Sequence, residues 1–339
     1  MPVKNTVERI DVMAFKKSVA LCAAATLCFV GGAAEARRTT PTYTSLTVFG
    51  DSLVDAGNYL ADPTTNVNEP TAARGYFQGR WTNGYDYTDL LSIRLYGAPT
   101  QASYLGGQNY AYGGARVLDT TPAVPNLPDQ YASFQSRGTA IDSNGLYVLN
   151  FGANDIFNAA ATVTAGLYPT QDALIQAAAN NYAQFVQTLN NAGVRNILIT
   201  DFPVAGALAT SGNAYLTTAL NNLSLNADTT LYRFNYIDAF AKIGADPASY
   251  GLPPFTQTGT CQSGGAAAIA GGCVGYSSFD GTHPVAAVQN ALYQELNRQF
   301  ALDASVPEPM TWTMLIVGFG GIGLAMRRRQ RVSTTVRFA

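Results

Sequence analysis

The sequence predicts an α/β fold: a three-layer α/β/α sandwich in which a mainly parallel central sheet lies between two layers of helices. Two observations predict it. Short, continuously apolar runs that suit buried strands recur along the chain, and segments with apolar residues at helical spacing lie between them. This alternation is typical of a parallel sheet covered on both faces. The chain shows no internal repeat and no clear second domain, so we expect one domain over residues 37–305.

The strands are predicted from short β-prone runs bounded by turn residues. The first run leads into a Gly-Asp turn, and the second ends at Gly152. We expect strands at residues 46–49, 146–151, 196–200 and 234–237.

The helices are predicted from apolar residues that recur every three or four positions. The longest such pattern is closed by Gly193, a residue type that commonly ends helices. We expect helices at residues 85–95, 171–192, 216–231 and 285–302. Stretches rich in Pro, Gly and polar residues are expected to be loops or extended segments, and these cover residues 62–84, 122–128 and 251–275.

The composition excludes some classes of function. Charged residues make up only 12% of the chain and the formal net charge is −2, whereas nucleic-acid binding needs clustered basic side chains. We therefore expect no nucleic-acid partner. His283 is the only histidine, which argues against a multi-histidine metal hydrolase, and we predict no metal or other cofactor.

The N-terminal segment has the features of a secretory signal peptide. Lys16 and Lys17 are followed by a short apolar run at residues 19–30, and Ala34-Glu35-Ala36 suits cleavage after Ala36. We predict a signal peptide over residues 1–36, with Met13 as an alternative start. An uncleaved signal anchor is the alternative.

The cysteines divide between this peptide and the exported body. Cys22 and Cys28 leave with the signal peptide, whereas Cys261 and Cys273 remain. In an oxidising compartment, a pair of cysteines that closes a small Gly-rich loop is expected to form a disulfide.

The C-terminal segment is set apart from the body. Val306-Pro307-Glu308-Pro309 precedes an apolar run at residues 310–326, which is followed by Arg327-Arg328-Arg329. The run predicts a short transmembrane helix whose arginines lie at the cytoplasmic end; a buried C-terminal helix is the alternative. The segment 306–330 resembles the PEP-CTERM sorting signal of certain Gram-negative bacteria. The resemblance implies processing by an exosortase and delivery to the cell envelope, surface or exterior, with residues 331–339 left as a tail.

A serine and the single histidine suggest acyl chemistry. Ser52 follows the first predicted strand and the turn Gly50-Asp51, so it is expected at the carboxyl end of the sheet, where such sheets hold ligands. A serine needs a base and an orienting group to act as nucleophile. His283 suits the base, and Asp280 is close enough in sequence to orient it. The plain alternative for Ser52 is a helix N-cap.

Two further turns offer donors for a developing oxyanion. Gly113-Gly114 gives a turn in which a backbone N–H can approach a substrate. Asn154 places an amide just past the carboxyl end of the second predicted strand. Each feature alone has an ordinary explanation, as a turn or a helix cap.

In this order, the four motifs resemble those of the SGNH, or GDSL, hydrolase family over essentially the whole exported body. The matching segments are residues 49–58, 109–115, 152–155 and 280–284, with 79–84 similar to the lipase-like branch. The resemblance implies a serine esterase or lipase that cleaves carboxylic esters, with catalytic Ser52, Asp280 and His283. It assigns the oxyanion hole to Ser52, Gly114 and Asn154, with Gly113 as the alternative glycine.

Other functions remain open on the sequence alone. An acyltransferase or a carbohydrate deacetylase would use the same residues on a lipid or polysaccharide ester. A non-catalytic surface protein that binds polysaccharide is an alternative of another class.

Overall fold

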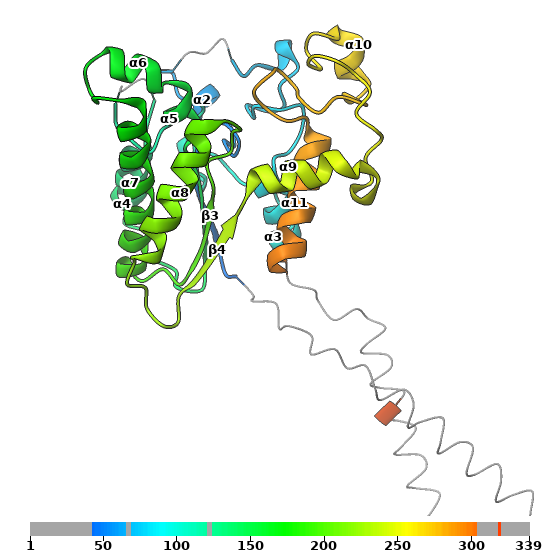
Figure 1. Ribbon diagram of the computed structural model, residues 1–339. Helices are drawn as coiled ribbons and strands as arrows, with labels where there is room; N and C mark the ends of the chain where they lie inside the picture. Colours follow the sequence, from blue (N-terminus) through cyan, green and yellow to red (C-terminus); the bar gives the residue numbers. More distant parts are fainter. Residues whose placement is uncertain (1–42, 66–68, 121–123, 304–317, 320–339) are drawn as a thin grey trace, which may run out of the picture. The chain divides into compact units, whose positions relative to one another are not determined.

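The computed structural model describes residues 43–65, 69–120, 124–303 and 318–319 (Figure 1). The chain divides into two compact units, residues 1–39 and 40–339, and every described residue belongs to the second. The predicted signal peptide, the motif 306–309, the arginine cluster and the tail lie outside the described residues, as does the predicted membrane helix 310–326 apart from residues 318 and 319. Within the described ranges, no helix is long and apolar enough to cross a membrane.

A parallel sheet forms the centre of the domain. In the described part of the chain it has the strand order β1-β2-β3-β4, and each neighbouring pair is parallel. The strands are β1 (Leu46–Gly50), β2 (Leu146–Asn150), β3 (Asn196–Thr200) and β4 (Thr230–Phe234). All of β1 and β2 is buried, as expected for strands covered on both faces.

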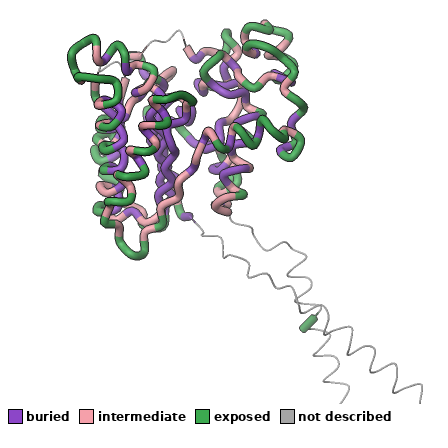
Figure 2. Tube along the Cα trace, viewed as in Figure 1, coloured by how far each residue is buried: buried purple, intermediate pink, exposed green. Residues whose placement is uncertain are grey.

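Helices cover both faces of this sheet, so the predicted α/β/α architecture is confirmed. Val48 and Leu198 point to one face, in a core shared with helices α3, α9 and α11. Phe49 and Ile199 point to the other face, in a core shared with α4, α7 and α8 (Figures 1 and 2). The helices are α2 (Asn58–Ala61), α3 (Tyr87–Tyr96), α4 (Leu127–Ser136), α5 (Ala153–Phe157), α6 (Ala159–Thr164), α7 (Gln171–Ala192), α8 (Ala207–Asn221), α9 (Tyr236–Ala245), α10 (Gly265–Ala270) and α11 (Ala286–Phe300).

The prediction of one helix over residues 216–231 is wrong. Helix α8 begins earlier, at Ala207, and ends at Asn221, whereas Leu231 belongs to β4. The leucine spacing continues past the end of the helix by coincidence. Strand β4 lies at the edge of the described sheet, where Thr230 is exposed and Arg233 half-buried, so it lacks the apolar run that marks the inner strands.

The predicted strand at residues 234–237 is also wrong beyond its first residue. Phe234 ends β4, and Asn235 then caps α9 by accepting a hydrogen bond from the Asp238 N–H over 3.0 Å. An asparagine cap followed by an acidic residue in the first turn favours a helix start.

The loop predictions need smaller corrections. The segment 122–128 was expected to be extended or turned, but α4 begins at Leu127, and Pro128 fits in its first turn because no intrahelical bond is needed there. The predicted loop 251–275 contains the short helix α10, and the loop 62–84 contains one turn of 3-10 helix at Ala72–Arg74.

Candidate active site

Ser52 and Asn154 lie beyond the carboxyl ends of two adjacent strands, β1 and β2. The Asp51 N–H donates to the Asn150 carbonyl over 3.0 Å, which continues the β1–β2 pairing as far as the residue before Ser52. Asn154 is in the first turn of α5, which follows β2. Because parallel strands end at the same edge of a sheet, a hydroxyl and an amide from distant parts of the chain are placed at one edge.

His283 lies between Ser52 and Asp280. Its Nε2 is 2.7 Å from the Ser52 Oγ, although the two residues are 231 positions apart, and its Nδ1 is 2.6 Å from the Asp280 Oδ2. An ionised carboxylate only accepts hydrogen bonds, so Nδ1 carries the hydrogen and Nε2 accepts the Ser52 hydroxyl. The predicted nucleophile, base and orienting acid are therefore within hydrogen-bond reach of one another.

The Asp280 carboxylate is fixed by several donors. Its Oδ1 accepts the N–H groups of Thr282, at 2.9 Å, and of His283, at 2.8 Å. Its Oδ2 accepts the Tyr76 hydroxyl at 2.9 Å, in addition to the imidazole. Burial opposes ionisation, but the hydrogen bond and charge of His283, aided by the backbone donors, lower the pKa of Asp280 to about 2. The carboxylate stays ionised at any pH near neutrality.

A tight turn brings Asp280 and His283 together. Gly281 has φ 104°, a left-handed conformation that favours glycine, and its N–H donates to the Ser278 Oγ over 2.9 Å. The Phe279 N–H then bonds the His283 carbonyl over 2.7 Å, which closes the reversal of the chain.

The Cys261–Cys273 disulfide lies against this turn. The Cys261 N–H donates to the Ser278 carbonyl over 3.0 Å, and the Gln262 N–H donates to the Phe279 carbonyl over 2.9 Å. The loop that the disulfide closes is thus hydrogen-bonded to the backbone immediately before Asp280.

The hydrogen bonds of the structure distinguish the two candidate glycines of the oxyanion hole. The Gly113 N–H is already used, since it donates to the Asp55 Oδ2 over 2.9 Å. The Gly114 N–H has no acceptor among the described residues, and neither has the Ser52 N–H. Gly114 has φ 82°, which favours glycine, and its loop is held at the end of β1 by the Tyr112 N–H, which donates to the Gly50 carbonyl over 3.1 Å. Of the two glycines, Gly114 is therefore the one whose N–H is left without an acceptor among the described residues.

Asn154 has one amide hydrogen available. Its Nδ2 donates to the Ala115 carbonyl over 3.0 Å, which uses one hydrogen and fixes the side chain. Asn154, Ser52 and His283 line the same hollow, whose volume is about 40 Å³. The second hydrogen is free to meet an oxygen bound there.

Sequence reasoning missed the aromatic residues that support the site. Trp81 packs against the imidazole of His283 with ring centroids 5.3 Å apart, and Tyr76 bonds Asp280. A Cβ on Gly113 would lie 2.4 Å from the Trp81 indole, so this glycine allows close packing of the ring. Both aromatics come from the loop 62–84, and although Trp81 lies in the segment 79–84 that resembles the lipase-like branch, the sequence does not show which side chain either aromatic contacts.

Asp51, next to the nucleophile, is a buried carboxyl with incomplete hydrogen bonding. Its Oδ1 accepts the Leu53 N–H and the Asn150 amide, both at 3.1 Å, but its Oδ2 has no partner among the described residues. Burial raises the pKa of Asp51 to about 7.

This raised pKa predicts a pH-dependent stability. Between about pH 4 and pH 7 the folded state holds a proton on Asp51 that the unfolded chain has lost, so stability falls as pH rises. Asp51→Asn is expected to make the free energy of unfolding less pH-dependent in this window, by up to about 1.4 kcal/mol per pH unit. Urea denaturation at stepped pH measures the slope. Asp142→Asn is the control, since hydroxyl donors lower the pKa of Asp142 and it titrates below the window; equal slopes for Asp51→Asn and the wild type would contradict the prediction.

Within the described ranges, no group of three or more His, Cys, Asp or Glu side chains is arranged to hold a metal ion.

Comparison with known proteins gives the family. The family model for GDSL-like Lipase/Acylhydrolase matches residues 46–296, and that for the PEP-CTERM protein-sorting motif matches residues 305–329. A GDSL esterase/lipase from Arabidopsis thaliana is 24% identical over 82% of this chain and 96% of its own length.

Other relatives match over shorter segments. Lipase 1 from Photorhabdus luminescens is 32% identical over 48% of this chain, and a second Arabidopsis GDSL esterase/lipase is 29% identical over 50% of it. The chain spans 23% and 55% of the length of these two relatives. With the family match over most of the folded body, the chain belongs to the GDSL-like lipase/acylhydrolase family and carries a PEP-CTERM sorting motif behind its hydrolase domain.

Proposed function

We propose that the protein is an exported serine esterase that hydrolyses carboxylic esters, with Ser52 as nucleophile, His283 as general base and acid, and Asp280 as the group that orients the imidazole. The observation that carries the proposal is the continuous pair of short contacts, 2.7 Å from Ser52 to His283 and 2.6 Å from His283 to Asp280. Such a chain of hydrogen bonds activates a hydroxyl that is otherwise a weak nucleophile.

The first half of the reaction forms an acyl-serine. The Ser52 Oγ attacks the ester carbonyl carbon while Nε2 of His283 takes the hydroxyl proton, and Asp280 stabilises the imidazolium. The tetrahedral intermediate then collapses: the bond to the alcohol oxygen breaks, and His283 returns the proton to that oxygen.

The second half releases the acid. Water attacks the acyl-serine, His283 takes a proton from it, and the proton returns to the Ser52 Oγ as the acid leaves. If an alcohol replaces water, the same steps give acyl transfer, so product analysis with an added acceptor alcohol separates the hydrolase from the acyltransferase. A deacetylase would differ only in taking its ester on a carbohydrate.

The oxyanion is assigned to the N–H groups of Ser52 and Gly114 and to the Asn154 amide. Asn154→Ala is expected to lower kcat by about 10²–10³-fold with little change in KM, because the lost hydrogen bond strengthens as the oxyanion forms. Steady-state kinetics on a soluble ester measure it. Asn158→Ala, which removes an amide from the next turn that bonds the Asn154 carbonyl, is the matched control with a small effect. Comparable losses in the two variants would remove Asn154 from the oxyanion hole.

Membership of the family is not enough to infer that a protein is catalytically active, because one Arabidopsis relative is named an inactive GDSL esterase/lipase-like protein. The assembled polar set at the end of the sheet favours an enzyme over a surface protein that only binds polysaccharide. A fluorophosphonate probe tests this directly, since it should label Ser52 and abolish hydrolysis of p-nitrophenyl acetate. Absence of both labelling and hydrolysis in the folded protein would refute the proposal.

The sorting motif supports export and processing. We infer that residues 1–36 are removed as a signal peptide, that residues 310–326 span the membrane at least transiently, and that an exosortase-type enzyme acts at the PEP-CTERM motif of a Gram-negative envelope. Terminal sequencing by mass spectrometry of the protein from cell envelope and medium tests both cleavages; an intact chain in every fraction would contradict them.

A further inference from the structure

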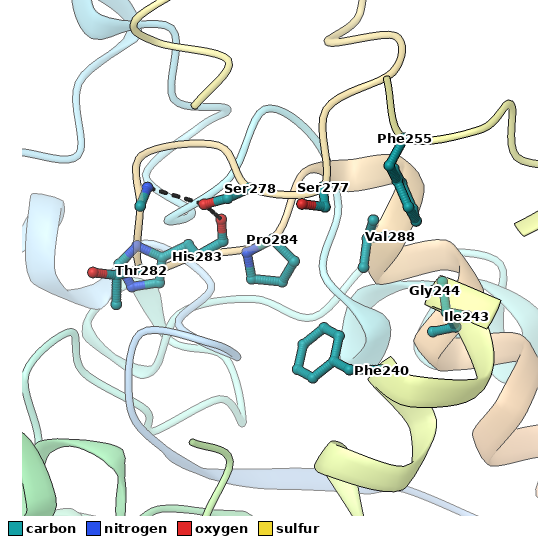
Figure 3. A pocket seen from close by; sticks show the side chains of 11 residues that line it. Phe240, Ile243, Gly244, Phe255, Ser277, Ser278, Thr282, His283, Pro284 and Val288 are labelled. Carbon is teal, nitrogen blue, oxygen red and sulfur yellow. Dashed lines mark hydrogen bonds between the residues drawn. The ribbon is translucent and has the colours of Figure 1, made fainter. Parts of the chain in front are cut away.

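A pocket of about 420 Å³ adjoins the small hollow at Ser52 (Figure 3). His283, Pro284 and Phe240 line both spaces, whereas Ser52 and Asn154 line only the hollow. The pocket therefore adjoins the hollow at His283, Pro284 and Phe240, and it continues to Phe255 and Val288, which do not line the hollow.

The lining of this pocket suits an uncharged, apolar group. Phe240 faces Pro284, and Phe255 lies beside Val288 (Figure 3). No Asp, Glu, Lys or Arg lines it, and the Ser278 hydroxyl is already bonded to the loop backbone. A phosphate or other charged group would find no counter-ion there, whereas apolar surface gains from leaving water.

The direction of proton transfer decides which half of the ester enters the pocket. His283 must protonate the alcohol oxygen as it leaves, so that oxygen lies within hydrogen-bond reach of Nε2. The oxyanion is held apart from it, by the Asn154 amide and the backbone donors. The remainder of the alcohol can then pass His283 and Pro284, which line both spaces, into the large pocket.

We propose that this pocket binds the alcohol half of the substrate, so that the preferred substrates are esters of bulky apolar alcohols with a short acyl group. The acyl group is left with the hollow of about 40 Å³ at Ser52, which is far smaller. This assignment rests on the proposed function, because it uses His283 as the acid that protonates the leaving group.

Isomeric esters distinguish the two halves of the substrate. Hexyl acetate and methyl heptanoate have the same atoms, but the chain lies on the alcohol side in one and on the acyl side in the other. We expect kcat/KM for hexyl acetate to exceed that for methyl heptanoate by about tenfold or more, since each buried methylene contributes up to about fourfold. We also expect kcat/KM to rise along methyl, butyl and hexyl acetate.

A substitution in the pocket wall tests whether this pocket causes the expected preference for hexyl acetate. Gly244 lines it from α9, and a Cβ there meets no atom within 4 Å, so Gly244→Leu adds a bulky apolar side chain at the pocket wall with room for its first carbon. Replacing a helical glycine also favours the helix. The matched control is Ala241→Leu, an exposed position on the same helix that does not line the pocket.

The expected result is that Gly244→Leu lowers kcat/KM for hexyl acetate by about tenfold and leaves methyl acetate unchanged, while Ala241→Leu changes neither. A preference for methyl heptanoate, or equal effects of the two variants, would overturn the assignment of the pocket. Failure of the proposed function looks different: methyl acetate would not be hydrolysed at all, and the fluorophosphonate probe would not label Ser52.

Discussion

Replacing Ser52 by alanine is expected to lower kcat for ester hydrolysis by on the order of 10⁶-fold, with KM nearly unchanged. The Ser52 Oγ is the atom that lies 2.7 Å from the His283 Nε2, and alanine leaves no atom at that position to form the acyl intermediate. Steady-state kinetics with p-nitrophenyl acetate measure the loss, and the fluorophosphonate probe reports the same hydroxyl independently.

The fold should not depend on this hydroxyl. Among the described residues its side chain bonds only His283, so the melting temperature of Ser52→Ala should stay close to that of the wild type. Ser136→Ala, which removes an exposed hydroxyl on α4, is the matched control with wild-type activity and labelling. Substantial activity in folded Ser52→Ala would place the nucleophile elsewhere.

Replacing Asp280 by asparagine is expected to lower kcat by about 10⁴-fold through the imidazole tautomer. The Oδ1 of Asp280 accepts two backbone N–H groups, so the asparagine must keep its carbonyl oxygen there and direct its NH₂ at Nδ1 of His283. An NH₂ donor requires Nδ1 to accept, which moves the ring hydrogen to Nε2. An Nε2 that carries a hydrogen cannot take the proton of Ser52.

Tyr76→Phe separates this effect from a general loosening of the loop. It removes one neutral hydrogen bond to the same carboxylate, at 2.9 Å, and leaves the tautomer unchanged. We expect a loss of less than about tenfold, in keeping with the modest net contribution of such a bond. Equal losses in Tyr76→Phe and Asp280→Asn would mean that loop position, and not the tautomer, controls the rate.

The sequence predicts the fold best where one element carries one periodic pattern. Helix α7 has its predicted bounds because a long apolar face is closed by Gly193, and β3 has its predicted bounds because it is an inner strand with a continuous apolar run. Around β4 this reasoning fails. The strand lies at the edge of the described sheet and carries Thr230 and Arg233, so the leucines before it extend the helical pattern beyond the true end of α8.

The site is predictable only in the parts that lie in motifs. Ser52 and His283 stand in short segments that resemble a family, and the structure brings them to 2.7 Å. Tyr76 comes from an irregular loop outside these motifs, and Trp81 lies in the similar segment 79–84, but no spacing in either place reveals the partner of the aromatic side chain. The choice between Gly113 and Gly114 required coordinates, since it depends on which N–H the Asp55 carboxylate already holds.

The Cys261–Cys273 disulfide makes the support of the Asp280 turn depend on the redox conditions in which the chain folds. The backbone N–H groups that bond to the chain just before Asp280 belong to the loop closed by the Cys261–Cys273 disulfide. Such a disulfide forms only in an oxidising compartment. A chain kept in a reducing cytosol would lack this disulfide, so we expect its Asp280 turn to be held less firmly. We therefore expect protein folded in a periplasm and protein folded in a cytosol to differ in whether this disulfide is formed.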